Sequence, residues 1–228
     1  MSRQLDTIAH NMANVNTAGF KKTQSSFSKI MDARMQGKSG IEDIKHDQSL
    51  DFSQGNVVAD ERPLNFALVG EGFFVVESPQ GPRYTRSGVF GLNTNGQIVD
   101  SEGRIVSGTQ GPITIPEGVT KNDITVTLDG VVKAAGTELG QMKVVHFDGK
   151  EHELKPAGDS AFMAPKGLTA RPAENTVVKQ GHHETSNVEM VRELVSMIMV
   201  SRLYESNLKV IEAKGQTTSS LLGLAKTP

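Results

Sequence analysis

The sequence predicts a mainly β protein with α-helical termini: an antiparallel β central domain flanked by two helices that pair in a coiled-coil-like region. Short runs of Val, Ile, Thr and Phe, separated by Gly turns, fill residues 61–180. At both ends of the chain, apolar residues instead recur at spacings of three and four, the helical period. We therefore expect an amino-terminal helix and extended linker over 1–60, a β-rich domain over 61–180 and a helix within 181–228.

The amino-terminal helix is predicted by four apolar residues that share one face: Leu5, Ile8, Met12 and Val15. Asn16, Thr17 and Gly19 follow and favour a helix end, because glycine readily adopts the left-handed backbone of a helix cap. From there to about residue 60 the chain is polar and weakly patterned, with QGKSG at 36–40. This stretch is typical of an extended linker.

The central domain is predicted by five short β-prone runs, at residues 73–76, 84–86, 113–115, 124–127 and 142–145. Between them lie dipeptides that tolerate positive φ and favour tight hairpins: Asn95-Gly96, Glu102-Gly103, Asp129-Gly130 and Asp148-Gly149. No helical pattern separates the runs, so an antiparallel sheet is favoured over a parallel one. The order of the strands is not encoded in this pattern.

The carboxy-terminal helix, expected over 186–222, carries the strongest signal. Ser186 followed by Glu189 fits a capping box, in which each side chain bonds the other's backbone amide. A heptad-like seam then runs through Met190, Leu194, Met197, Ser201, Tyr204, Leu208, Ile211, Gly215, Thr218 and Leu222. A second apolar strip follows Val188, Val191, Val195 and Ile198. A helix with so much apolar circumference packs against more than one neighbour.

The simplest partner for this helix is the amino-terminal one, although docking of a single helix on the β domain is the alternative. The amino-terminal seam is only about two heptads long, so apolar surface remains for other subunits. Asn11, Asn14 and Asn16 either fix the register of such a contact through their side-chain amides or simply end the helix. Arg202 and Tyr204 are candidate interface anchors, the alternative being packing within one subunit.

Composition excludes several functional classes. The chain has 228 residues, 24 Lys and Arg against 26 Asp and Glu, and a formal net charge of −2, so no basic surface for nucleic acid is expected. The absence of Cys excludes disulfides, thiolate catalysis and Cys-based zinc sites. The first residues lack the apolar core of a secretory signal peptide, and no apolar stretch is long enough for a transmembrane helix.

An enzyme is the alternative of a different class, and its best support is the run His182-His183-Glu184, with His146 and His152 elsewhere. Adjacent histidines lack the i, i+4 spacing that places two imidazoles on one helical face. No phosphate-binding loop or nucleophile elbow is present. We therefore expect no catalytic residues, no metal, no cofactor and no small-molecule substrate. A free-standing β binding module is a further alternative, which the two helical termini disfavour.

Three segments resemble the flagellar rod and hook protein family. Residues 4–22 (QLDTIAHNMANVNTAGFKK) are similar to its amino-terminal signature, and 184–211 (ETSNVEMVRELVSMIMVSRLYESNLKVI) to its closing helix. Residues 70–108, with a Gly-Phe-Phe strand, Tyr-Thr-Arg and an Asn-Gly-Gln hairpin, resemble its shared β domain. The length leaves no room for the extra domains of hook proteins, so the rod members are the closer match, the proximal rod type before the distal.

The resemblance implies a structural, non-enzymatic subunit of the basal-body rod in the periplasmic space. Its partners would be copies of itself and homologous axial subunits, and it would leave the cell through the flagellar type III export apparatus. The residues expected at the assembly interface are Leu5, Ile8, Asn11, Met12, Asn14, Val15, Asn16, Met190, Leu194, Met197, Ile198, Arg202, Tyr204, Leu208 and Ile211.

Overall fold

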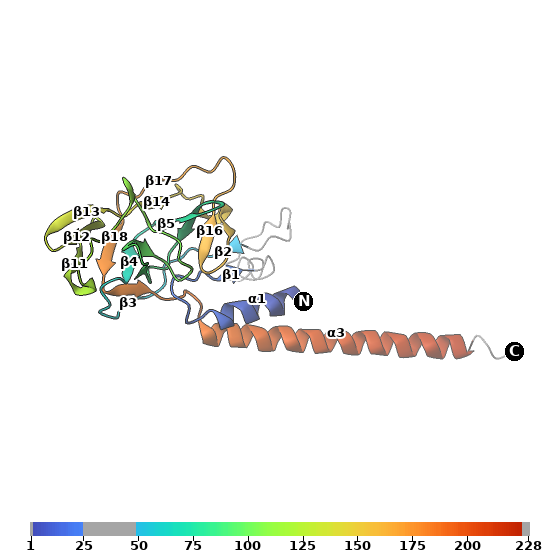
Figure 1. Cartoon of the computed structure of the whole chain (residues 1–228). Helices are drawn as coiled ribbons and strands as arrows, with labels where there is room; N and C mark the ends of the chain where they lie inside the picture. Colours follow the sequence, from blue (N-terminus) through green and yellow to red (C-terminus); the bar gives the residue numbers. More distant parts are fainter. Residues whose placement is uncertain (1, 25–48, 225–228) are drawn as a thin grey trace. The chain divides into compact units, whose positions relative to one another are not determined.

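A computed structural model describes residues 2–24 and 49–224, with side chains over 3–24 and 49–215. The chain divides into two compact units, one formed by 1–13 with 189–228 and the other by 14–188. Figure 1 shows the elements of both. Most of the predicted linker, including residues 36–40, lies outside the described residues, as do the side chains of Thr218 and Leu222.

The larger unit, Asn14–Val188, is built from antiparallel strands, as the sequence predicts. Its strands are β1 (Thr23–Gln24), β2 (Ser49–Leu50), β3 (Val57–Ala59), β4 (Phe66–Val69), β5 (Phe73–Ser78), β6 (Gly81–Thr85), β7 (Gly91–Leu92), β8 (Ile98–Val99), β9 (Ser107–Gly108), β10 (Gly111–Pro112), β11 (Ile124–Val126), β12 (Val131–Ala134), β13 (Thr137–Gln141), β14 (Val144–His146), β15 (Lys155–Pro156), β16 (Ala161–Met163), β17 (Arg171–Pro172), β18 (Val177–Gln180) and β19 (His182–Glu184). Two 3-10 turns, η1 (Lys121–Asp123) and η2 (Glu151–Glu153), interrupt them.

The main sheet of this unit has six strands in the order β15-β16-β6-β5-β14-β17. A three-stranded sheet joins β11, β12 and β13, and smaller pairs include β18 with β4 and β19 with β3. Strands β18 and β19 follow one another, so the chain from Val177 to Glu184 pairs first with β4 and then with β3. The last strand of the β unit, β19, is therefore followed in the sequence by the last helix.

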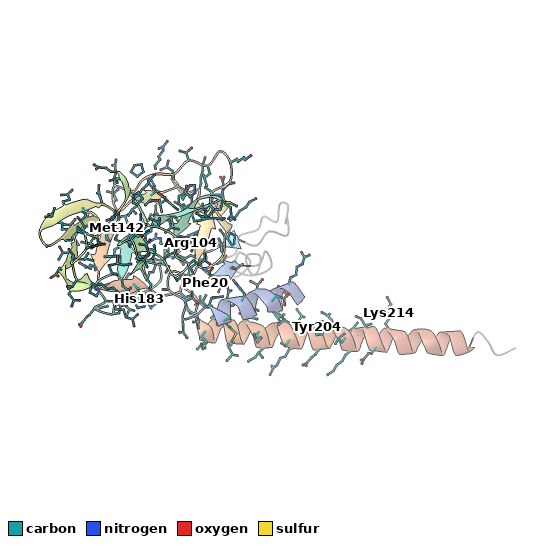
Figure 2. All side chains as sticks on the ribbon, in the orientation of Figure 1. Phe20, Arg104, Met142, His183, Tyr204 and Lys214 are labelled. Carbon is teal, nitrogen blue, oxygen red and sulfur yellow. The ribbon has the colours of Figure 1, made fainter. Side chains whose placement is uncertain are left out.

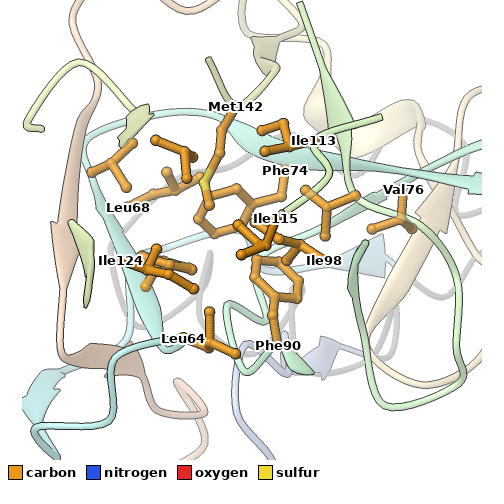
Figure 3. Close-up of a cluster of buried hydrophobic side chains, with 14 residues drawn as sticks. Leu64, Leu68, Phe74, Val76, Phe90, Ile98, Ile113, Ile115, Ile124 and Met142 are labelled. Carbon is orange, nitrogen blue, oxygen red and sulfur yellow. The ribbon is translucent and has the colours of Figure 1, made fainter. Parts of the chain in front are cut away.

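Strand β5 is buried on both faces, which explains its unbroken run Phe73-Phe74-Val75-Val76. Phe74 and Val76 point into one core cluster, drawn in Figure 3 with Leu68, Phe90 and Ile98 among its members. Phe73 and Val75, alternating with them, point into a second cluster that also holds Tyr84, Phe147 and Phe162. One strand thus joins two cores.

The predicted tight turns are present. Asn95-Gly96 lies between β7 and β8, and Asp129-Gly130 lies between β11 and β12. Gly96 and Gly130 have φ of 73° and 79°, the left-handed conformation that other residues adopt only with strain. Of the predicted runs, 113–115 is not a regular strand: Thr114 makes a single bridge to Gln97 while Ile113 and Ile115 are buried in the core.

The smaller unit contains α1 (Ser2–Ala13) and α3 (Met190–Leu224), which lie side by side and run in opposite directions (Figure 1). Two details of the prediction were wrong. Helix α1 ends at Ala13, so Val15 belongs to the following turn. Helix α3 begins at Met190, so Ser186 stands before it, and its hydroxyl accepts a hydrogen bond from the amide of Val188, not from that of Glu189.

We expect Phe74→Ala to lower the free energy of unfolding by about 3–5 kcal/mol, because it empties a fully buried ring position in the first core cluster. Urea unfolding of the purified chain measures the loss. Leu128→Ala is the matched control, since Leu128 is 61% exposed in a turn and should change stability by less than about 0.5 kcal/mol. Equal losses from the two variants would contradict this assignment of the core.

Candidate functional site

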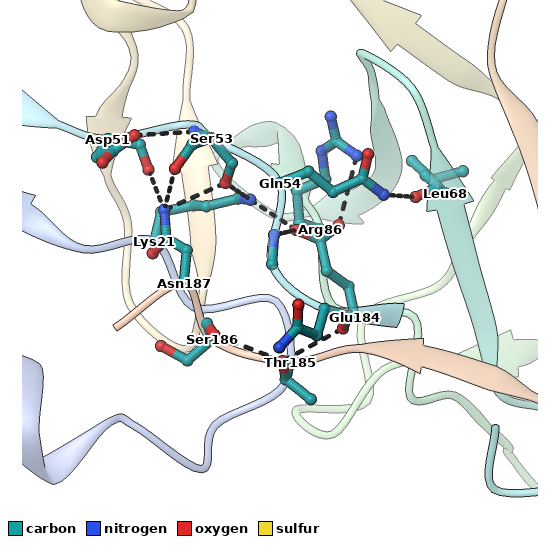
Figure 4. Close-up of polar contacts among 12 residues, drawn as sticks. Lys21, Asp51, Ser53, Gln54, Leu68, Arg86, Glu184, Thr185, Ser186 and Asn187 are labelled. Atoms are coloured by element: carbon teal, nitrogen blue, oxygen red, sulfur yellow. Dashed lines mark hydrogen bonds and ion pairs between the residues drawn. The ribbon is translucent and has the colours of Figure 1, made fainter. Parts of the chain in front are cut away.

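A cluster of charged side chains is buried in the β unit and is drawn in Figure 4. It consists of Lys21, Arg86 and Glu184, which we call the charge cluster. Lys21 Nζ lies 2.6 Å from Glu184 Oε1, and Arg86 Nη1 lies 3.4 Å from Glu184 Oε2. The side chains of Lys21 and Glu184 have no exposed surface, so water does not screen their attraction.

Further hydrogen bonds satisfy these charges. Lys21 Nζ also donates to the carbonyl of Ser53 at 2.6 Å, and the amide of Gly55 donates to Glu184 Oε1 at 2.9 Å. Arg86 Nη2 donates to the carbonyl of Gly70 at 2.8 Å. Buried ions are tolerated only when they are paired and hydrogen-bonded in this way.

The charge cluster holds two cations and one anion, and burial shifts the pKa of both cations. Burial lowers the pKa of the Lys21 ammonium below its usual value of 10.5, and the attraction of Glu184 only partly opposes that effect. Burial likewise lowers the pKa of the Arg86 guanidinium, which lies 5.4 Å above the centre of the Phe73 ring. Glu184 is therefore the group on which both cations depend.

Asn187 extends the same contacts toward the start of α3. Its Oδ1 accepts a hydrogen bond from the amide of Lys22 at 2.7 Å. Its Nδ2 donates to the carbonyls of Asp51 and Ser53 at 2.8 and 3.1 Å. One amide side chain thus ties together three segments that are distant in the sequence.

Two glycines allow these segments to approach closely. A Cβ on Gly19 would lie 2.1 Å from the backbone nitrogen of Ser87, and one on Gly55 would lie 2.0 Å from the carbonyl oxygen of Thr185. The positive φ of Gly19, 66°, does not cap α1, which ends six residues earlier. It brings the Gly19 amide to the carbonyl of Glu184, 2.8 Å away.

In the helical unit, Asn11 and Glu193 form a buried polar contact between α1 and α3. The Asn11 amide nitrogen lies 3.4 Å from Glu193 Oε2, and both side chains are almost fully buried. Asn11 stands near the end of α1 and Glu193 near the start of α3, as the antiparallel arrangement of the two helices requires.

The opposite face of α3 is apolar and exposed, even in the turns that lie beside α1. Val191, Val195 and Ile198 share one face at spacings of four and three, and Val191 is 75% exposed. Glu193 stands two positions from Val191 and Val195, which places it about 160° away around the helix. Figure 2 shows side chains projecting along α3, with Tyr204 labelled.

The predicted interface residues fall into three groups. Ile8 and Asn11 are buried in the helical unit, with Leu5, Met12 and Met197 partly so. Asn14, Val15 and Asn16 lie beyond α1, in the β unit, where the side chain of Asn14 accepts a hydrogen bond from Thr17. The remaining predicted residues are exposed on α3: Met190, Leu194, Ile198, Arg202, Tyr204, Leu208 and Ile211.

Sequence reasoning missed Lys21, Arg86, Glu184 and Glu193 as a structural group. Lys21 and Arg86 stand inside the two quoted family motifs, next to Phe20 and Thr85. Both motifs contain other charged residues, so no local signal in the sequence distinguishes Lys21 and Arg86 as buried.

The histidines considered for catalysis have ordinary surroundings. His182 Nδ1 contacts the carbonyl of Gln180, and His183 Nδ1 lies 3.1 Å from Asp60 Oδ2. Across residues 2–24 and 49–224, no group of three His, Cys, Asp or Glu is arranged to hold a metal ion. In the same part of the chain, no helix has the length and apolarity needed to span a membrane.

Comparison with known proteins matches all three parts of the chain to one family. Residues 1–21 match "Flagella basal body rod protein", 67–134 match "Flagellar hook protein FlgE/F/G D1 domain" and 179–224 match "Flagellar basal body rod FlgEFG protein C-terminal". The rod protein FlgG of Agrobacterium fabrum is 32% identical, over 94% of this chain and 91% of its own length. The chain belongs to the flagellar basal-body rod proteins.

Other relatives carry two names within this family. FlgG of Borreliella burgdorferi is 31% identical over 97% of this chain, and FlgF of Caulobacter vibrioides is 30% identical over 96%; each is matched over 91% of its own length. The resemblance drawn from the sequence motifs is therefore confirmed at the level of a rod protein of FlgF or FlgG type. Family membership makes the chain a structural protein of the flagellar basal body.

We expect Glu184→Gln to destabilise the β unit by about 3–5 kcal/mol, because it leaves two buried cations without an anion. Lys21→Met should cost less, since Arg86 and Glu184 remain as a balanced pair. Urea unfolding of both variants and the wild type shows which variant loses more unfolding free energy. A larger loss for Lys21→Met would show that Glu184 is not the centre of the charge cluster.

The lowered pKa of Lys21 predicts a pH dependence. Between that lowered value and 10.5, the unfolded chain binds the Lys21 proton more fully than the folded chain, so rising pH favours folding through this group. The difference in unfolding free energy between wild type and Lys21→Met should shift in favour of the wild type as pH rises from neutral toward 10.5. Urea unfolding at a series of pH values tests this, and a constant difference would contradict it.

Proposed function

We propose that this chain builds the flagellar rod by packing α1 and α3 into a layer of helices shared with neighbouring subunits, while the β unit forms the outer wall. The rod then transmits torque across the periplasmic space and supports assembly of the distal rod and hook. The observation that carries the proposal is the exposed apolar face of α3, opposite the face that contacts α1.

The arrangement of α3 favours polymer contacts over a closed dimer. Beyond the turns that lie beside α1 (Figure 1), exposed apolar residues occupy two roughly opposite faces of α3, with Tyr204 and Leu208 on one and Leu203 and Val210 on the other. Contacts on both faces can therefore continue from subunit to subunit. Repeated head-to-tail contacts of this kind build a helical filament. The neighbours are copies of this chain or homologous axial subunits, whose terminal helices would offer the same apolar pattern.

Within this proposal the predicted residues divide by role. Asn11, with Glu193, sets the register of α1 on α3. Leu194, Tyr204 and Leu208 supply contact area on α3 for neighbouring helices, in the manner of interface anchors. The proposed route out of the cell is the flagellar type III export apparatus, in keeping with the family.

In a strain whose own copy of the gene has been deleted, we expect basal bodies without complete rods, no hooks and no swimming. A plasmid with the wild-type gene should restore all three. Val191→Glu should fail to restore them, because a charge on the exposed apolar face of α3 opposes helix packing, while the apolar variant Val191→Leu should succeed. Electron microscopy of isolated basal bodies and a swimming assay give the readouts.

Purified Val191→Glu should keep the wild-type unfolding midpoint, since Val191 is 75% exposed in the isolated chain. Complete basal bodies in the deleted strain, with no second copy of the gene, would overturn the rod proposal. Restoration by Val191→Glu would instead overturn the role of this face of α3.

A further inference from the structure

The two connections between the β unit and the helices run side by side. The amide of Gly19, six residues after α1, donates to the carbonyl of Glu184, six residues before α3. The amide of Lys22 donates to the side chain of Asn187, and Lys21 pairs with the side chain of Glu184. The outgoing and returning chain segments are therefore joined by backbone, amide and ionic contacts within a few residues.

A third segment fastens this pair of connections to the β unit. The carbonyl of Ser53 accepts a hydrogen bond from Lys21, and the amide of Gly55 donates one to Glu184. The amide of Asp51 donates to the carbonyl of Lys22, and the carbonyl of Asp51 accepts from the side chain of Asn187. Phe52, between them, packs edge-on against Phe73 and Phe162 with ring centres 5.5 and 5.0 Å apart. The segment is thus anchored in the second core cluster, and the connections are anchored through it.

Ordinary loops do not carry this many buried polar contacts, because loop backbone is usually satisfied by water. Nor does the charge cluster contribute much net stability by itself, since desolvation of buried ions offsets most of their attraction. Such a cluster instead disfavours arrangements that separate the segments bearing the charges, because separation leaves a buried charge unpaired.

We propose that Lys21, Arg86, Glu184 and Asn187 form a clamp that holds the connections to α1 and α3 together and fixes both to the β unit, so that load passes between the helices and the outer wall of the rod. The four are positioning residues, and this role rests on the proposed rod function. With the clamp open, each helix would be tied to the β unit by a flexible segment alone.

Hydrogen exchange of the purified full-length chain tests the clamp without reference to the rod. In Glu184→Gln, the amides of Gly19 and Lys22 should lose their protection and exchange like unstructured amides, while those of β5 should accelerate only by the loss of global stability that urea unfolding measures. Asn187→Ala is a second, uncharged variant in case Glu184→Gln does not fold. It should accelerate exchange at Gly19 by about tenfold, although Asn187 does not contact that amide.

Asp100→Asn is the matched control. Asp100 is a nearly buried acid of the same unit that pairs with Arg104 at 2.6 Å, remote in sequence from both connections. Loss of this ion pair should accelerate amide exchange in β5 but leave the exchange rates of the Gly19 and Lys22 amides as in the wild type. Retained protection of Gly19 and Lys22 in Glu184→Gln, or their loss of protection in Asp100→Asn, would falsify the clamp.

The same variants in the deleted strain connect the clamp to the rod. Glu184→Gln should give reduced or absent swimming where the wild-type plasmid restores it, and Asp100→Asn should swim. If Glu184→Gln swims like the wild type, the load-bearing part of the proposal is overturned. If the wild-type plasmid itself restores no rods, the rod function fails while the exchange result still decides whether the clamp exists.

Discussion

Glu184 places a carboxylate in the interior of the β unit, and the surrounding chain is arranged to keep it there. A charge removed from water is stable only when counter-charges and hydrogen-bond donors reach it. Lys21, Arg86 and the amide of Gly55 supply them, and each comes from a different part of the sequence. The need to satisfy one buried anion therefore fixes the positions of several segments at once, including the segment that follows α1.

The charge cluster depends in turn on the core beneath it. Arg86 lies over the ring of Phe73, and Phe73 belongs to the strand whose two faces fill both core clusters. Phe52 reaches the same aromatic group from the segment that bonds Lys21 and Glu184. Apolar packing thus positions Phe73 and Phe52, and the buried ions hold the segments after α1 and before α3 against this aromatic group.

The sequence predicted the parts of this structure that follow from local period and turn chemistry. The β-rich centre, the Asn95-Gly96 and Asp129-Gly130 turns and the long final helix all follow from such patterns. Glu184 could not be predicted to be buried, because its partners lie up to 163 positions away and no local pattern records them. In the sequence, the run His182-His183-Glu184 was considered only as support for a catalytic or metal-binding site. The sequence also did not predict the end of α1 at Ala13. Val15 continues the apolar period of the helix, although it belongs to a turn in the β unit.

The 163 positions between Lys21 and Glu184 also affect the order of events during synthesis. A ribosome releases the amino-terminal signature first, yet the groups that fasten it appear only when about four-fifths of the chain has been made. Until then Lys21 has no buried anion to meet, and water remains its favoured surroundings. The charge cluster therefore cannot form before Glu184 has been synthesised, so the segment after α1 takes up its final contacts late in synthesis.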